Sequence, residues 1–177
     1  MKRSGSVEIK PGEYVEYTFS NISNASNIYL EDFKWIDYIP TDYIRVEKMT
    51  TGTWNQDINY SVLYKTNKSQ EYILFKEKMQ TTEDIELDFT QIELSKDEYI
   101  TEICFDFGKV DTGFKESTSP TMRCKSLETL QDGQAFTNQT KTVGVYFGII
   151  AESEDKWTTI VHKPKEEHPK VLPRTGE

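Results

Sequence analysis

Histidine and cysteine, which supply many catalytic bases and zinc ligands, are scarce in this 177-residue chain, with two of each. A Ser-His-Asp or Cys-His hydrolase needs a histidine inside the fold. His162 and His168 instead lie at the end of the last strand-like segment and in a charged tail. The two cysteines also lack the paired spacing of a zinc site. We therefore predict no catalytic residues, no metal centre of this kind and no cofactor.

Long apolar runs are missing as well. No window reaches the roughly 18 apolar residues that a membrane helix needs. The first residues, MKRSGS, are not followed by the apolar run of a secretion signal. We interpret residues 1–6 as a cloning scar or ragged start, and the chain as one module cut from a larger secreted protein.

Positive charge is in deficit, with 21 Lys and Arg against 30 Asp and Glu and a net charge of −9. This balance argues against nucleic acid and anionic membrane surfaces as partners. Hydrophobic residues make up 36% and aromatic residues 12% of the chain, so it can bury a real core. We expect one folded domain of an extracellular protein.

The two cysteines are predicted to be free thiols. Cys104 alternates with Glu102 and Asp106, which indicates an outward face, whereas Cys124 alternates with Met122. Side chains that point apart cannot be joined without moving the backbone. A disulfide, which a secreted location would permit, is the alternative.

Period-two alternation of apolar and polar residues dominates the chain and predicts β-strands. The clearest alternating segments are 15–19, 58–64, 85–89, 101–107, 143–149 and 157–161. Turn residues such as Pro11-Gly12, Thr51-Gly52 and Asp132-Gly133 separate them. Many short strands at this spacing predict an all-β, antiparallel β-sandwich over residues 7–162, followed by an extended tail over residues 163–177.

The tail ends in Leu-Pro-Arg-Thr-Gly, which resembles the sorting signal by which Gram-positive sortases attach proteins to the cell wall. The residues of this motif are Leu172, Pro173, Arg174, Thr175 and Gly176. The resemblance implies cleavage between Thr175 and Gly176 and transfer of the Thr175 carbonyl to a wall amine of peptidoglycan. Pro173 favours the extended backbone that such recognition needs. The charged, proline-containing stretch before the motif is typical of a flexible wall-spanning linker.

Several segments resemble the DUF11 "conserved repeat" domains of bacterial surface proteins. They are 11–19 (PGEYVEYTF), 21–24 (NISN) and 37–40 (DYIP), with Glu13 and Ile39 replacing the usual Asp and Leu. Segments 51–55, 106–110, 136–138 and 157–159 resemble the version in clostridial-type sortase-anchored proteins. The resemblance covers about residues 7–162 and implies an immunoglobulin-like, Greek-key sandwich that serves as an extracellular stalk or adhesin module.

Some surface domains of this kind form a Lys–Asn isopeptide bond, which needs a buried Lys, an Asn and a protonated acid. Asp37 and Asn138 match the family positions for the acid and the amide, and both share parity with apolar neighbours. The Lys is missing, because Lys10 has the wrong phase and Lys2 lies in the ragged start. We therefore favour a structural interpretation, in which Asp37 caps the turn before Pro40 and Asn138 bonds backbone groups.

Three classes of function remain open. The first is a non-enzymatic, sortase-anchored surface module with sortase and peptidoglycan as partners. The second is a module that binds a host glycan or matrix protein, for which Trp35, Trp54 and Trp157 would have to be exposed and coplanar. The third is a hydrolase with clustered carboxylates, for which no acid/base pair stands out.

No Asp-x-Asp-x-Asp-Gly loop is present, so no calcium site of the EF-hand type is predicted. A looser calcium site is the weaker alternative. It would draw on Asp106, Asp111 and the region of Asp32 and Asp37. We expect Trp35 and Trp54 to fill the core, as sandwich tryptophans usually do.

Overall fold

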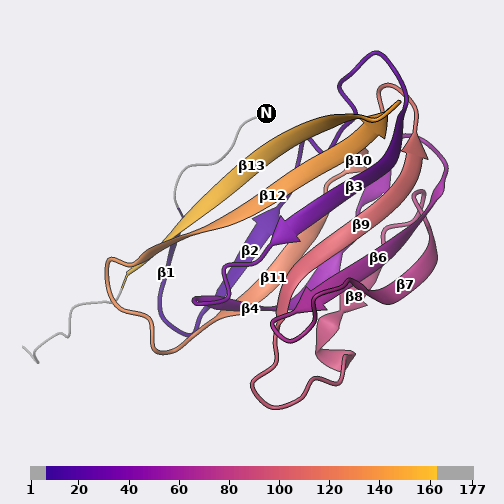
Figure 1. The fold of residues 1–177 in the computed structure, drawn as a ribbon. Helices are drawn as coiled ribbons and strands as arrows, with labels where there is room; N and C mark the ends of the chain where they lie inside the picture. Colours follow the sequence, from indigo (N-terminus) through magenta and orange to yellow (C-terminus); the bar gives the residue numbers. More distant parts are fainter. Residues whose placement is uncertain (1–6, 163–177) are drawn as a thin grey trace, which may run out of the picture.

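A computed structural model describes residues 7–162, and these residues form an all-β sandwich, which confirms the predicted fold class (Figure 1). The strands are β1 (Val7–Ile9), β2 (Tyr14–Thr18), β3 (Leu30–Tyr38), β4 (Ile44–Thr50), β5 (Thr53–Trp54), β6 (Asn59–Thr66), β7 (Ile73–Gln80), β8 (Glu86–Asp88), β9 (Ile100–Val110), β10 (Glu116–Thr118), β11 (Thr121–Ser126), β12 (Ala135–Tyr146) and β13 (Ile149–Val161). One 3-10 turn, η1 (Phe89–Gln91), follows β8. No helix within residues 7–162 is long and apolar enough to cross a membrane.

Two main sheets make up the sandwich. The larger has seven strands in the order β1-β13-β12-β3-β9-β6-β7, and the smaller has four in the order β2-β11-β4-β8. A two-stranded ribbon, β10-β5, accompanies them. Neighbours in space such as β12 and β3 lie far apart in sequence, as Greek-key connections require.

One pairing departs from the predicted antiparallel arrangement. β1 runs parallel to β13, with Val7 opposite Thr159 and Ile9 opposite Val161. After Pro11-Gly12 the chain crosses to the other sheet as β2. Because β1 and β13 lie at opposite ends of the chain, no tight hairpin fixes their relative direction, and their pairing could not be read from local turns.

The core is built from the inward-facing residues of the alternating strands. Phe19 packs edge-on against Trp35 at 4.9 Å between ring centroids, and Trp35 packs against Phe105 at 5.1 Å. Trp35 is 1% exposed and Trp54 is 4% exposed, which confirms that both fill the core. Such aromatic pairs add about 0.5–1.5 kcal/mol each beyond the area they bury.

The predicted strand over residues 143–149 is wrong, because a hairpin turn interrupts it. β12 ends at Tyr146, Phe147 and Gly148 form the turn, and β13 begins at Ile149. Val143 and Val145 lie on the outer face of β12, where the alternation of apolar residues simply continues into the turn. Because apolar residues continue to alternate on the solvent-facing side of β12, the sequence pattern did not reveal where this strand ends.

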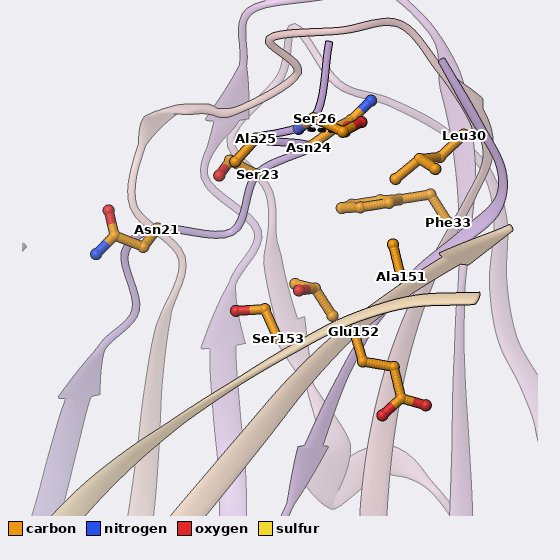
Figure 2. A pocket seen from close by; sticks show the side chains of 11 residues that line it. Asn21, Ser23, Asn24, Ala25, Ser26, Leu30, Phe33, Ala151, Glu152 and Ser153 are labelled. Carbon is orange, nitrogen blue, oxygen red and sulfur yellow. Dashed lines mark hydrogen bonds between the residues drawn. The ribbon is translucent and has the colours of Figure 1, made fainter. Parts of the chain in front are cut away.

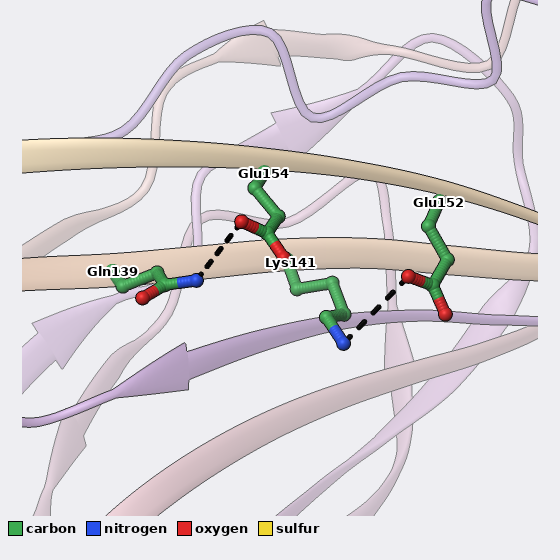
Figure 3. Close-up of polar contacts among 4 residues, drawn as sticks. All are labelled: Gln139, Lys141, Glu152 and Glu154. Atoms are coloured by element: carbon green, nitrogen blue, oxygen red, sulfur yellow. Dashed lines mark hydrogen bonds and ion pairs between the residues drawn. The ribbon is translucent and has the colours of Figure 1, made fainter.

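Further along the outer face of this hairpin, away from the tip, the side chains are polar and pair across the strands (Figure 3). Lys141 of β12 lies 3.7 Å from the carboxylate of Glu152 of β13. Gln139 donates a hydrogen bond of 3.1 Å to Glu154. Such exposed cross-strand pairs contribute about 0.2–1 kcal/mol each and help to fix the register of the two longest strands.

Both cysteines are free, as predicted. Cys104 lies on β9 of the larger sheet and points to its outer face, opposite in phase to Phe105, while Cys124 lies on β11 of the smaller sheet and points into the core. Both are fully buried. Burial raises the pKa of Cys104 to about 12 and raises the pKa of Cys124 well above its ordinary value. Both thiols therefore stay protonated and unreactive at neutral pH.

Candidate functional site

The strongest candidate site is a pair of buried polar side chains on neighbouring strands of the larger sheet. Asp37 lies on β3 directly opposite Thr140 of β12, which makes Asn138 its diagonal neighbour on the same face. Both Asp37 and Asn138 are 0% exposed. The parity argument that predicted both side chains to point inward is thus confirmed.

The two side chains bond each other. Asn138 Nδ2 donates a hydrogen bond to Asp37 Oδ1. Within the described part of the chain, Asp37 Oδ2 and Asn138 Oδ1 have no hydrogen-bond partner. Because buried polar groups are nearly always paired, a half-satisfied pair of this kind is unusual and costs stability.

Burial raises the pKa of Asp37 to about 7, and the hydrogen bond from Asn138 opposes this shift only in part. Desolvation disfavours the charged form of a carboxyl, so the proton is retained to near neutral pH. Asp37 is therefore a buried acid that changes its charge near neutral pH, in contact with a carboxamide.

Two further polar groups face the pair from the smaller sheet. Tyr17 of β2 and Cys124 of β11 are close enough to Asp37 for its carboxylate to raise the pKa of each, although burial is the largest cause in both. The Tyr17 hydroxyl and the Cys124 thiol are consequently neutral. None of these three acids presents a nucleophile or a charge to solvent.

The structural interpretation favoured above is wrong in its details. Asp37 does not cap the turn at Pro40, because its carboxyl accepts from Asn138. Within the turn, the backbone N–H of Tyr43 donates to the carbonyl of Pro40 at 3.0 Å. The amide nitrogen of Asn138 donates its hydrogen bond to Asp37 and not to a backbone carbonyl. The sequence showed that both side chains face inward, but not that diagonal register on β3 and β12 brings them together.

A cross-link at this site would need a buried lysine, and the described residues provide none. Lys10 is exposed beyond the end of β1, which agrees with its predicted phase. Lys2 lies outside the described residues. In the chemistry of isopeptide formation the acid polarises the amide carbonyl and the lysine attacks it. In this structure Asp37 contacts the amide nitrogen of Asn138 and not its carbonyl oxygen, so neither part of that chemistry is in place.

The tryptophans do not form a ligand platform. Trp35 and Trp54 are in the core, and the half-buried Trp157 packs its ring edge-on against Phe19 at 5.1 Å and 90°. A sugar-stacking surface needs exposed, coplanar rings. The arrangement therefore disfavours the glycan-binding alternative that relied on these residues.

A small pocket of about 170 Å³ lies between the loop after β2 and the β12–β13 hairpin (Figure 2). Leu30 and Phe33 supply its apolar wall. On the polar side of the pocket, Asn24 is bonded within the protein, because its amide donates to the carbonyls of Ile28 and Asp111. The Asn24 amide nitrogen is therefore not free to bind a ligand.

The looser calcium site is not assembled. Within residues 7–162 no group of three or more His, Cys, Asp and Glu side chains is placed to hold a metal ion. Asp37 is in the core, and Asp106 accepts a hydrogen bond of 3.1 Å from the backbone N–H of Gly108. Calcium needs six or more oxygen ligands, which these separated carboxylates cannot supply.

The residues of the sorting motif, 172–176, lie outside the described residues. Comparison with models of known protein families and with curated protein sequences finds no match to this chain. The resemblances stated from the sequence therefore remain proposals.

Proposed function

We propose that this chain is a non-enzymatic module of a cell-wall-anchored extracellular protein, a wall-proximal stalk or adhesin domain of the DUF11-like, immunoglobulin-like kind. In this proposal it is the substrate of a sortase that cleaves between Thr175 and Gly176. The observation that carries the proposal is Leu-Pro-Arg-Thr-Gly at residues 172–176, placed after a charged, proline-containing linker. The β-sandwich that precedes this linker supports it, because such folds are common among surface modules.

The reaction replaces one amide bond with another. The Thr175 carbonyl leaves the nitrogen of Gly176 and joins a wall amine of peptidoglycan, while the segment that begins at Gly176 departs with a free amino group. The domain itself supplies no catalytic group. Its part is to fold stably and to hold whatever it carries at a distance from the wall.

The stalk proposal is favoured over binding of a host glycan or matrix protein. Of the three tryptophans, two are buried and the third is partly covered by Phe19, so these residues give a ligand no flat aromatic surface. These tryptophans instead pack between the two sheets and hold them against each other. A spacer needs this rigidity more than it needs a pocket.

A transpeptidation assay tests the proposal. The full chain is incubated with a purified sortase and triglycine, and the intact mass is measured. We expect the mass of a chain in which triglycine has replaced Gly176-Glu177. Thr175→Ala is the matched control and should stay unmodified. An unchanged mass for the wild-type chain, under conditions in which a reference peptide reacts, would contradict the proposal.

A further inference from the structure

The tip of the β12–β13 hairpin has a sequence that its backbone does not favour. Tyr146 pairs with Ile149, and the two residues between them have positive φ, 48° for Phe147 and 78° for Gly148. Positive φ at both central residues is the mark of a type I′ turn, which strongly prefers Asn-Gly or Asp-Gly. A bulky aromatic residue at positive φ is strained. The turn geometry therefore does not explain the presence of Phe147.

The same tip exposes more apolar surface than other parts of the described chain. Phe147 is 80% exposed, Ile149 is 69% exposed and Ile150 is 60% exposed, and these are the three most exposed large hydrophobic side chains of residues 7–162. Phe147 touches the ring of Tyr146 at 4.5 Å between centroids and otherwise faces solvent. A strained residue that is also exposed and apolar points to a surface that is covered in function.

The side chains around the tip are graded in polarity. Behind the apex, Tyr146 packs edge-on against Tyr29 at 5.3 Å, and the Lys109 ammonium lies over the Tyr29 ring at 4.5 Å. One row further from the apex than Tyr146, Glu31 lies opposite Val145, which itself lies opposite Ile150, so charge begins in the row of Ile150. An apolar apex, then tyrosines, then charged groups is the order in which side chains meet a bilayer, from acyl chains through headgroups to water.

From this order we propose that the hydrophobic tip, formed by Tyr146, Phe147, Ile149 and Ile150, inserts into the headgroup region of a zwitterionic lipid bilayer such as phosphatidylcholine. This inference goes beyond the proposed anchoring to the wall and does not depend on it. It adds a binding surface at one end of the sandwich, built on the two longest strands (Figure 1).

The charged side chains beside the tip determine which kind of lipid surface it can bind. Glu31 and Asp32 are exposed beside the tip together with Lys109, so acids outnumber this base there, and the chain carries a net charge of −9. Anionic lipids would repel this end of the molecule, whereas phosphatidylcholine has no net charge. A second copy of the chain would bring the same acids face to face, and a few apical side chains are too small an interface for a stable dimer. A zwitterionic bilayer meets neither obstacle.

Flotation of the full chain with extruded phosphatidylcholine vesicles tests the proposal. We expect the wild-type chain to float with the vesicles, and Phe147→Asn to weaken binding about tenfold, the effect of losing one large buried apolar side chain. Leu74→Asn removes a side chain that is 50% exposed on β7, far from the tip in sequence, and should leave binding unchanged. Ile149→Asn should act like Phe147→Asn.

Thermal unfolding separates this effect from loss of folding. Asn is the preferred residue at the first turn position, so Phe147→Asn should melt at the same or a higher temperature than the wild-type chain. Replacing roughly a third of the phosphatidylcholine by phosphatidylserine should weaken binding. The proposal is overturned by absence of flotation, by equal flotation of Phe147→Asn, or by stronger binding to the anionic vesicles. It is also overturned if sedimentation velocity shows a dimer that Phe147→Asn abolishes, because the tip would then bind a second copy.

Discussion

Asn138 donates a hydrogen bond to Asp37 between two adjacent strands of the core, and each of these residues keeps one oxygen with no hydrogen-bond partner in the described part of the chain. A pair of this kind is neither an ordinary structural contact nor a complete reactive site. It makes the stability of the sandwich depend on whether Asp37 carries a proton. Several testable properties of the domain result from it.

Stability should fall as pH rises from 3.8 to about 7. The pKa of Asp37 is raised from 3.8 to about 7 in the folded chain. The native state therefore binds more protons than the unfolded state between these values, and the contribution of Asp37 is fully present below 3.8 and lost by about 7. The shift corresponds to on the order of 4 kcal/mol. Urea unfolding at about pH 5 and about pH 8 measures the part of this contribution that is lost above pH 5, about 2–3 kcal/mol.

Asp37→Asn keeps the shape of the side chain and its acceptor oxygen but removes the titration. We expect this variant to lose most of that pH dependence and to be more stable than the wild-type chain at about pH 8. Asp42→Asn, at an exposed position, is the matched control and should keep the wild-type dependence. Identical pH dependence in wild type and Asp37→Asn would show that another group is responsible.

Removing one member of the pair should cost more than removing both. Asn138→Leu leaves the Asp37 carboxyl buried without its donor, a loss of about 1–3 kcal/mol. Combining Asp37→Leu with Asn138→Leu replaces the pair with apolar groups and should recover much of this loss. Urea unfolding of the two single variants and the double variant gives the coupling. A double variant that is as unstable as Asn138→Leu, or less stable, contradicts the expectation.

The chain should carry no internal cross-link. Asp37 and Asn138 are in contact, but no lysine of the described residues is buried beside them. The intact mass should therefore equal the sum of the residues. Formation of a Lys–Asn bond would release one ammonia, a deficit of about 17 Da. A deficit that Asn138→Ala abolishes would reveal a lysine at this site and refute the prediction.

Gly52 and Gly113 should differ sharply in their tolerance of a methyl group. Both have positive φ, 69° and 80°. A Cβ on Gly52 would lie 2.2 Å from the carbonyl oxygen of Thr118 and 2.9 Å from the nitrogen of Pro120, whereas a Cβ on Gly113 meets nothing within 4 Å.

Gly113→Ala should thus cost only the backbone strain, about 1–2 kcal/mol. Gly52→Ala adds a clash with backbone that cannot rotate away, and overpacking of this kind costs about 1–3 kcal/mol more. Equilibrium unfolding in urea compares the two variants directly. Equal losses would mean that the connection between β10 and β11 can move aside.

Much of the fold could be predicted from alternation and turns. The inward phase of Trp35, Asp37 and Asn138 came from parity with their neighbours, and the structure confirms it. Parity is a local property, since successive side chains of a strand point to opposite faces. It indicates which face a residue occupies and leaves open which residues meet there.

Parity could not predict which strands pair with each other when they lie far apart in sequence. The contact between Asp37 and Asn138 depends on the register of β3 against β12, about a hundred residues apart in sequence. The parallel pairing of β1 with β13 has no local signal either. The strand predicted over 143–149 failed because Phe147 occupies a turn position that normally carries Asn or Asp. That exception is the residue on which the lipid-binding proposal rests.

Anchoring to the wall is the central claim, and wall-bound peptide mass spectrometry tests it most directly. If the source is the walled bacterium that the proposal implies, its cell walls are purified, digested with muramidase and cleaved after lysine, which isolates the segment beginning at Val171. The account predicts a peptide that ends at Thr175 and is joined through its carbonyl to a fragment of peptidoglycan. A peptide that continues through Gly176 to Glu177, recovered only outside the wall fraction, would contradict it.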